Sequence, residues 1–288
     1  MASASGSESA QGLRIVAPPF IYALLMLAVP LLTIVAFSFF KDGYQTIIRE
    51  FTFENYRAVW ADPIFRTLML RSLLVAGMVT VVTVALAFPV AYFLSFVVRP
   101  ERKSLWLFLI TIPFWTSYLI RVFLWKVILG HNGVINSGLK SLGLIDQPLT
   151  FLLYNTGSII TTLAHAYAPF AILPIYVALE KIDRSLLEAG RDLGESRLMT
   201  FWRVTLPLAM PGVIAAVLIV FIPTIGDYVT PEVIGGGKIP MIANLIQVQM
   251  LALDNRPLGS ALAVTAMAIV AVVSLVFLFL NRRFLRMR

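Results

Sequence analysis

The sequence predicts an all-α, polytopic membrane protein, and three observations carry this prediction. The 288 residues are 59% hydrophobic and only 13% charged. Their mean hydropathy of +0.87 is far above that of a soluble mixed domain. Six apolar runs are long enough to cross a hydrocarbon core of about 30 Å, which takes roughly 20 helical residues. Lys and Arg gather in the gaps between alternate runs, as membrane topology requires.

The predicted spans follow one another with short polar gaps between them. They cover residues 15–39, 68–98, 105–129, 158–179, 208–225 and 258–280. We expect residues 1–12 to form a disordered cytoplasmic tail and residues 13–288 to form one transmembrane domain. The first run is too long for the apolar core of a signal peptide and lacks a basic segment before it, so we expect it to be retained as a span.

The distribution of Lys and Arg predicts the orientation of the chain. Most of these residues fall at Arg14 and in the segments 99–103, 181–203 and 282–288. Because cytoplasmic loops carry the excess of Lys and Arg, we expect both termini and the loop over residues 180–207 to face the cytoplasm. Topology thereby explains the net charge of +8. We expect no nucleic acid partner, since that would need a basic face on a folded domain.

The loop over residues 180–207 is predicted to fold as helix, turn and helix. Asp183 can cap the first helix through its side chain, and Gly194 is free to adopt the positive φ that ends a helix. Pro207 suits the first turn of the fifth span. One face of the first helix would carry the small or apolar residues Leu186, Gly190 and Leu193. The opposite face would carry the charged residues Glu188, Arg191, Asp192 and Glu195. The second helix would carry an apolar stripe of Leu198, Phe201, Trp202 and Thr205.

Two interpretations of this loop are open from its residues. A solvated connector would explain its arginines through the excess of positive charge on the cytoplasmic side. That interpretation does not explain an apolar face on so short a segment, or the small residues Ala189 and Gly190 beside Glu188. An apolar face with neither lipid nor core assigned to it favours a protein partner.

The spacing of the loop resembles that of a known family. Glu188-Ala189-Gly190, three residues, Gly194, nine residues and then Val204-Thr205-Leu206-Pro207 resembles the E-A-A, x3, G, x9, I-x-L-P loop of permease subunits of bacterial ABC importers. Gly190 stands in place of the second alanine and Val204 in place of the isoleucine, and both keep the size class. The resemblance implies a type I importer permease bundle that crosses the bacterial inner membrane several times.

The same resemblance implies how such a chain works. A cytoplasmic ABC ATPase dimer, which carries the ATP and Mg, would bind the loop at Glu188, Ala189, Gly190, Asp192, Gly194, Leu206 and Pro207. A second homologous permease subunit, a periplasmic or lipid-anchored solute-binding protein and membrane lipid would complete the assembly. We expect the chain itself to be no enzyme and to bind no cofactor, because it contains no G-x-x-x-x-G-K-[ST]. Its nearest match, GGGK at residues 235–238, lacks the first glycine and follows no strand.

Three stretches resemble the permeases of spermidine and putrescine importers. They are PFWTSYLIRVFLWKVILGHNGVIN at 113–136, LEKIDRSLLEAGRDLG at 179–194 and IPTIGDYVTPEVIGGG at 222–237. The resemblance implies uptake of polyamines. Permeases for amino-acid derivatives such as 4-aminobutyrate, for opines and for thiamine-like solutes share much of these stretches, so such small organic solutes are the alternative substrates.

A cation that crosses a low-dielectric path needs carboxylates and aromatic faces. Asp227 and Tyr228 directly follow the fifth span, and Trp115 and Tyr118 lie about halfway along the third. These four residues form the candidate substrate pathway. The alternatives are a turn role for Asp227 and ordinary bundle packing for the two aromatic residues of the third span. Arg121 either snorkels to the outer face or pairs with Asp227, and such a pair would weaken the case for a cation path.

Other classes of membrane protein fit the sequence less well. An ion-coupled secondary transporter, the alternative of a different class, would need paired acids or broken helices in its spans, and no inverted repeat is apparent. A membrane enzyme would need a catalytic cluster, and no catalytic constellation appears. The chain has no cysteine, and His131 and His165 lack metal-ligand spacing, so we expect no metal site.

Overall fold

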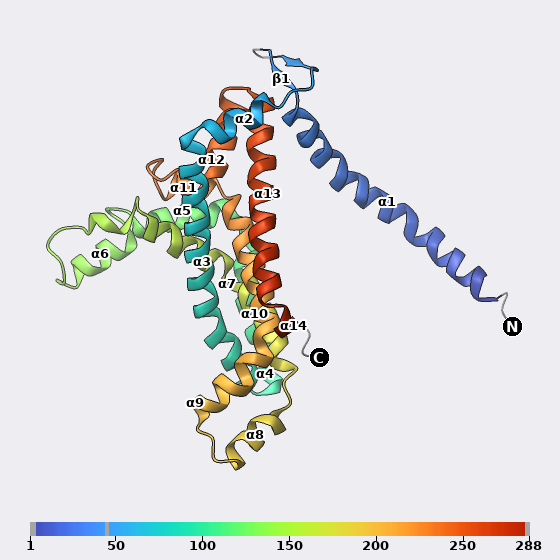
Figure 1. Ribbon diagram of the computed structural model, residues 1–288. Helices are drawn as coiled ribbons and strands as arrows, with labels where there is room; N and C mark the ends of the chain where they lie inside the picture. The colour runs from blue at the N-terminus through green and yellow to red at the C-terminus, as the bar shows by residue number, and fades with distance from the viewer. Residues whose placement is uncertain (1–3, 44–45, 286–288) are drawn as a thin grey trace. The chain divides into compact units, whose positions relative to one another are not determined.

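The computed structural model describes residues 4–43 and 46–285, and helices dominate it (Figure 1). Six helical segments of this described part are long and apolar enough to cross a membrane: Arg14–Ser38, Pro63–Phe96, Tyr118–Ser141, Thr156–Glu180, Arg197–Ile225 and Arg256–Leu280. The prediction of an all-α protein with six membrane helices is confirmed. The chain divides into two compact units, Met1–Asp62 with Ile246–Met267 and Pro63–Leu245 with Ala268–Arg288, and each is described by itself.

The first unit begins with helix α1 (Ala4–Ser38), which is followed by a hairpin of β1 (Lys41–Asp42) and β2 (Ile47–Ile48) and by helix α2 (Glu54–Ala61). The two strands pair antiparallel, with Lys41 opposite Ile48. The Asn55 side-chain amide donates to the carbonyls of Ser38 and Phe40, at 2.9 and 2.7 Å. The first bond satisfies a carbonyl that the end of α1 leaves open, and the second satisfies a carbonyl in the turn that follows it. The assignment of residues 1–12 to a tail stays a prediction, and residues 1–3 lie outside the described part.

Three long helices form the core of the second unit: α3 (Pro63–Phe96), α7 (Thr156–Glu180) and α10 (Leu206–Ile225). They run side by side in Figure 1, and apolar side chains from all three are fully buried between them, among them Val79, Ile175 and Val220. Asn155 begins α7 with a capping box shared with Ser158. Helix α11 (Val229–Val233) lies at one end of this bundle, and α8 (Arg184–Asp192) and α9 (Arg197–Thr200) lie at the other (Figure 1).

The region predicted as one continuous third span, residues 105–129, is broken in the structure. Helix α4 (Pro100–Thr111) ends in a 3-10 turn (Ile112–Trp115), and α5 (Tyr118–Leu129) starts after two extended residues. Pro113 contributes to the break, because proline has no N–H with which to continue the helical hydrogen bonds, and the extended Thr116 then separates the two helices. A further turn, after residue 129, separates α5 from α6 (Val134–Ser141). The expectation that Trp115 and Tyr118 lie midway along one helix is therefore wrong, and both lie at the break between two helices.

Close packing of α7 against α10 depends on Gly212. A Cβ atom at this position would lie 2.5 Å from both the Ala178 Cβ and the Pro174 carbonyl oxygen. We expect Gly212→Ala to lower the free energy of unfolding by about 1–3 kcal/mol, since a packed core accommodates an added methyl only by moving backbone. Gly77→Ala in α3 is the matched control, because nothing lies within 4 Å of a Cβ there. Thermal unfolding of the purified chain in detergent measures both, and equal midpoints for the two variants would contradict this prediction.

Candidate functional site

The segment between α7 and α10 forms the predicted helix, turn and helix. The Asp183 carboxylate accepts a hydrogen bond from the Ser185 backbone N–H at 2.9 Å and so caps α8. This bond holds the pKa of Asp183 below its ordinary value, because it favours the ionised form. Gly194 has a φ of +85°. The predicted cap and the predicted positive φ are both confirmed.

A complete Schellman motif at Gly194 fixes the turn. The N–H of Gly194 donates to the Arg191 carbonyl at 2.9 Å, and the N–H of Glu195 donates to the Gly190 carbonyl at 3.1 Å. Ser196 then caps α9 by accepting from the Met199 N–H at 3.2 Å. These hydrogen bonds define the direction in which the chain leaves α8.

The second helix continues without interruption into the membrane-spanning helix. A π-helical turn (Phe201–Thr205) joins α9 to α10, so Leu206 and Pro207 lie in the first turn of α10. Gly190 is buried against α9, where its added Cβ would lie 3.3 Å from the Thr200 side chain. An ion pair of 2.8 Å between Glu195 and Arg203 also ties the turn to the second helix. The segment therefore has internal contacts of its own that hold its shape.

The outer surface of α8 and α9 combines acids with apolar side chains. Glu188, Ala189 and Asp192 are exposed, and neither acid forms an ion pair with any residue in the described part of the chain. Leu193 is 85% exposed, and Leu198 and Trp202 are exposed as well. The predicted common face of Gly190 and Leu193 is thus divided, because Gly190 packs against α9 while Leu193 is open. Such a surface is typical of one that binds another protein.

A second candidate site lies where α5 meets the segment after α10. The Tyr118 hydroxyl donates to Asp227 Oδ2 at 2.8 Å and shares a hydrogen bond of 2.7 Å with Thr230 Oγ1. The other carboxylate oxygen of Asp227 accepts from the N–H groups of Val229 and Thr230, at 3.0 and 3.4 Å. Asp227 is only 8% exposed. It therefore has the turn role offered as an alternative, and it also faces a cavity.

The cavity beside Asp227 measures about 440 Å³. Its lining includes Tyr118, Arg121, Tyr167, Phe170, Asp227 and Tyr228. Trp115 does not line it and is 81% exposed. The structure thus brings together three of the four residues of the candidate pathway and leaves Trp115 apart.

Arg121 lies in the same cavity without forming an ion pair with Asp227. One of its terminal nitrogens donates to the Ala166 carbonyl at 3.3 Å. Its Nε is buried and has no hydrogen-bond partner among the described residues, and no ion pair there joins Arg121 to Asp227. The carboxylate and the guanidinium therefore line one cavity as separate charges.

Comparison with known proteins identifies the family. The family described as the binding-protein-dependent transport system inner membrane component matches residues 85–286, well over half of the chain. The chain belongs to this family. The permease is accordingly a multi-pass protein of the inner membrane and a member of a transporter class, not of an enzyme class.

Two curated relatives and one solved structure illustrate the similarity. The permease is 35% identical over 265 residues to the spermidine/putrescine transport system permease protein PotB of Haemophilus influenzae, covering 91% of each chain. It is 36% identical to PotB of Escherichia coli, covering 89% of the permease and 92% of that protein. A bacterial alginate ABC transporter, solved with an alginate-bound periplasmic protein, shares the fold at a TM-score of 0.76 and 17% identity, covering 97% of the permease and 96% of that chain.

Some functional residues of the permease escaped the sequence reasoning. Tyr167 lines the cavity with Tyr118 and Asp227, and the buried Thr230 binds the Tyr118 hydroxyl behind it, but neither residue stands in a motif that marks it. Ser196 carried a usable signal, since a serine directly before an apolar helical stripe is a frequent helix cap.

Proposed function

We propose that the permease imports polyamines in an assembly driven by a separate ATPase, which binds the surface of α8 and α9. The assembly would also contain a second homologous permease subunit and a solute-binding protein. ATP and Mg would bind to the ATPase dimer, and α8 would transmit the motion of that dimer to the membrane helices. The observation that carries the ATP-driven part is the fixed turn at Gly194, which presents Glu188 and Leu193 without any partner in the described chain.

Three features support docking at α8. The Schellman motif and the Ser196 cap hold the two helices in one geometry, so little conformational entropy is lost on binding. The exposed Leu193 and Trp202 supply apolar area, and aromatic side chains are enriched at protein contacts. Glu188 would form charge-assisted hydrogen bonds with the ATPase.

The cavity beside Asp227 supports a cationic substrate. An ammonium group that reaches the cavity can take the place of the Tyr118 hydroxyl on Asp227 Oδ2, since that oxygen is bonded by a side chain that can turn away. The faces of Tyr118 and Tyr228 would add cation–π attraction of about 0.5–2 kcal/mol. The names of the PotB relatives agree with a polyamine.

Uptake by the complete assembly tests the proposal. We expect vesicles that contain the permease, its partner permease, the ATPase and the binding protein to take up labelled spermidine or putrescine when ATP is supplied. Uptake of 4-aminobutyrate should be at least about tenfold slower, which corresponds to about 1.4 kcal/mol of discrimination. Uptake of 4-aminobutyrate alone would discard the polyamine and retain the ATP-driven importer. Failure of the ATPase to copurify with the permease would discard the coupling role of α8.

A further inference from the structure

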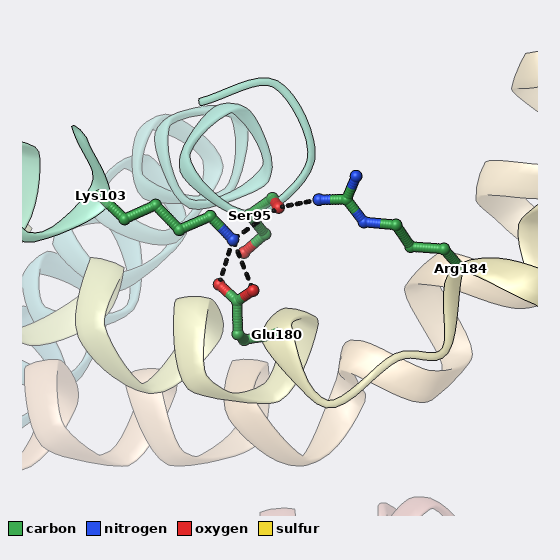
Figure 2. A network of polar contacts seen from close by, with 4 residues as sticks. All are labelled: Ser95, Lys103, Glu180 and Arg184. Carbon is green, nitrogen blue, oxygen red and sulfur yellow. Dashed lines mark hydrogen bonds and ion pairs between the residues drawn. The ribbon is translucent and has the colours of Figure 1, made fainter. Parts of the chain in front are cut away.

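Four helix ends meet in one polar cluster beside α8 (Figure 2). Ser95 lies at the end of α3, Lys103 in the first turn of α4, Glu180 at the end of α7, and Arg184 at the start of α8. The Lys103 ammonium donates to the Ser95 carbonyl at 3.1 Å and to the two Glu180 carboxylate oxygens at 2.5 and 2.9 Å. The Arg184 guanidinium donates to the same Ser95 carbonyl at 3.2 Å.

The Ser95 carbonyl is available because α3 ends there. The last four carbonyls of a helix have no partner within it, and the N–H groups of Val97 and Val98 both donate to the Phe93 carbonyl instead. Ser95 is only 2% exposed, so water cannot readily replace a missing partner. The partial negative charge at the end of α3 further favours the two cations.

Glu180 explains why Lys103 is held in the cluster. A carboxylate at the C-terminal end of a helix is unfavourable unless a cation neutralises it. The Lys103 side chain is largely buried and meets both carboxylate oxygens of Glu180, so it satisfies the end of α7 as well as the end of α3. The cluster therefore connects α3, α4 and α7 through one ammonium group, and Arg184 adds α8 to them.

Arg184 supplies a link that the covalent chain does not. The backbone joins α8 to α7 through only three residues, 181–183, which are not helical. Arg184 and Ser95 are 89 residues apart in sequence. Ile182 of this connector is buried in the apolar core, and the Arg184 bond adds a second attachment that runs from α8 directly to the end of α3.

We infer that Arg184 and Lys103 are positioning residues that fix the start of α8 to the ends of α3, α4 and α7, so that these four elements move as one body. This inference rests on the proposed function, in which α8 receives the motion of the ATPase. Arg184 acts at the bundle side of α8 and does not belong to the surface proposed to bind the ATPase. Its role is to transmit motion, not to dock.

Distance measurements test this inference directly. The sequence contains no cysteine, so cysteines introduced at Val97 and Arg191 can each carry one spin label. In the reconstituted assembly we expect one narrow distance distribution, the same without nucleotide and after trapping with ATP and vanadate. Arg184→Gln should broaden that distribution and lower uptake per ATP hydrolysed by about tenfold, while the ATPase remains bound. Arg184→Lys, which keeps a charged donor, should restore part of both quantities.

The control is Arg102→Gln, which removes an exposed arginine from the first turn of α4, outside the surface proposed to bind the ATPase, and should behave as the unmodified permease. If Arg184→Gln does not insert, Lys103→Gln is measured in the same way and should also broaden the distribution.

An unchanged distribution and unchanged uptake per ATP in Arg184→Gln would overturn the inference. A Val97 to Arg191 distance that changes on trapping in the unmodified assembly would overturn it too. If no ATPase binds the unmodified permease, the proposed function fails instead, and the distance distribution of the permease alone still shows whether Arg184 holds α8.

Discussion

Gly194→Val is expected to lower ATP-driven uptake by at least about tenfold while leaving the permease inserted in the membrane. The residue has a φ of +85°, and a β-branched side chain in this left-handed region costs about 1–2 kcal/mol or more. The strain falls on the Schellman motif that sets the path between α8 and α9, so the two helices would no longer present Glu188 and Leu193 together. Uptake and stimulated ATP hydrolysis in reconstituted vesicles measure the effect, and both should fall by at least about tenfold.

Two controls separate the turn geometry from general damage. Gly194→Asn should retain most of the uptake, because asparagine tolerates the left-handed conformation and nothing lies within 4 Å of a Cβ at this position. Gly143→Val imposes the same strain at a φ of +68°, again with open space around it, but after α6. Uptake in Gly194→Val as high as in Gly143→Val would refute the role of the turn.

Asp227→Asn is expected to lower polyamine uptake by about 10- to 100-fold, since a hydrogen bond to a charged group is worth about 1.5–3 kcal/mol. Asparagine can still accept from the N–H groups of Val229 and Thr230, so the turn role of Asp227 survives the substitution. Only the charge that faces the cavity is lost. Initial rates of labelled spermidine uptake, with copurified ATPase as the test of assembly, measure the effect.

Asp146→Asn is the matched control for this substitution, because it removes an exposed carboxylate outside the cavity. Tyr118→Phe gives a second comparison, since it keeps the aromatic face and removes the hydroxyl bound to Asp227. Full spermidine uptake by Asp227→Asn would show that the residue serves the turn alone.

The parts of this protein that were predictable from sequence are those set by local rules. The spans follow from apolar length, and the path of the loop follows from Asp183 as a cap and Gly194 as a residue with positive φ. The break in the third span also had a local cause in Pro113, but the apolar run on both sides of it favoured one continuous helix.

The contacts between distant residues were not predictable in the same way. Tyr118 and Asp227 are 109 residues apart in the sequence. Each is a polar residue beside an apolar run, and this shared feature does not show that the two are in contact. Arg184 and Lys103 counted in the sequence as ordinary basic residues of a cytoplasmic loop, although both bind the carbonyl that α3 leaves open. Only the packing of α3 beside α7 brings Arg184 and Lys103 to the same carbonyl of α3.

Site-specific cross-linking tests most directly whether α8 and α9 bind the ATPase. Because the chain has no cysteine, a single cysteine at Leu193 can carry a benzophenone label that reacts with any protein within reach. Illumination of the complete assembly should join the labelled Leu193 variant to the ATPase subunit. A label on Leu142, which is also exposed and directly follows α6, should not give this cross-link. A cross-link to the ATPase from Leu142 but none from Leu193 would contradict the docking role of α8.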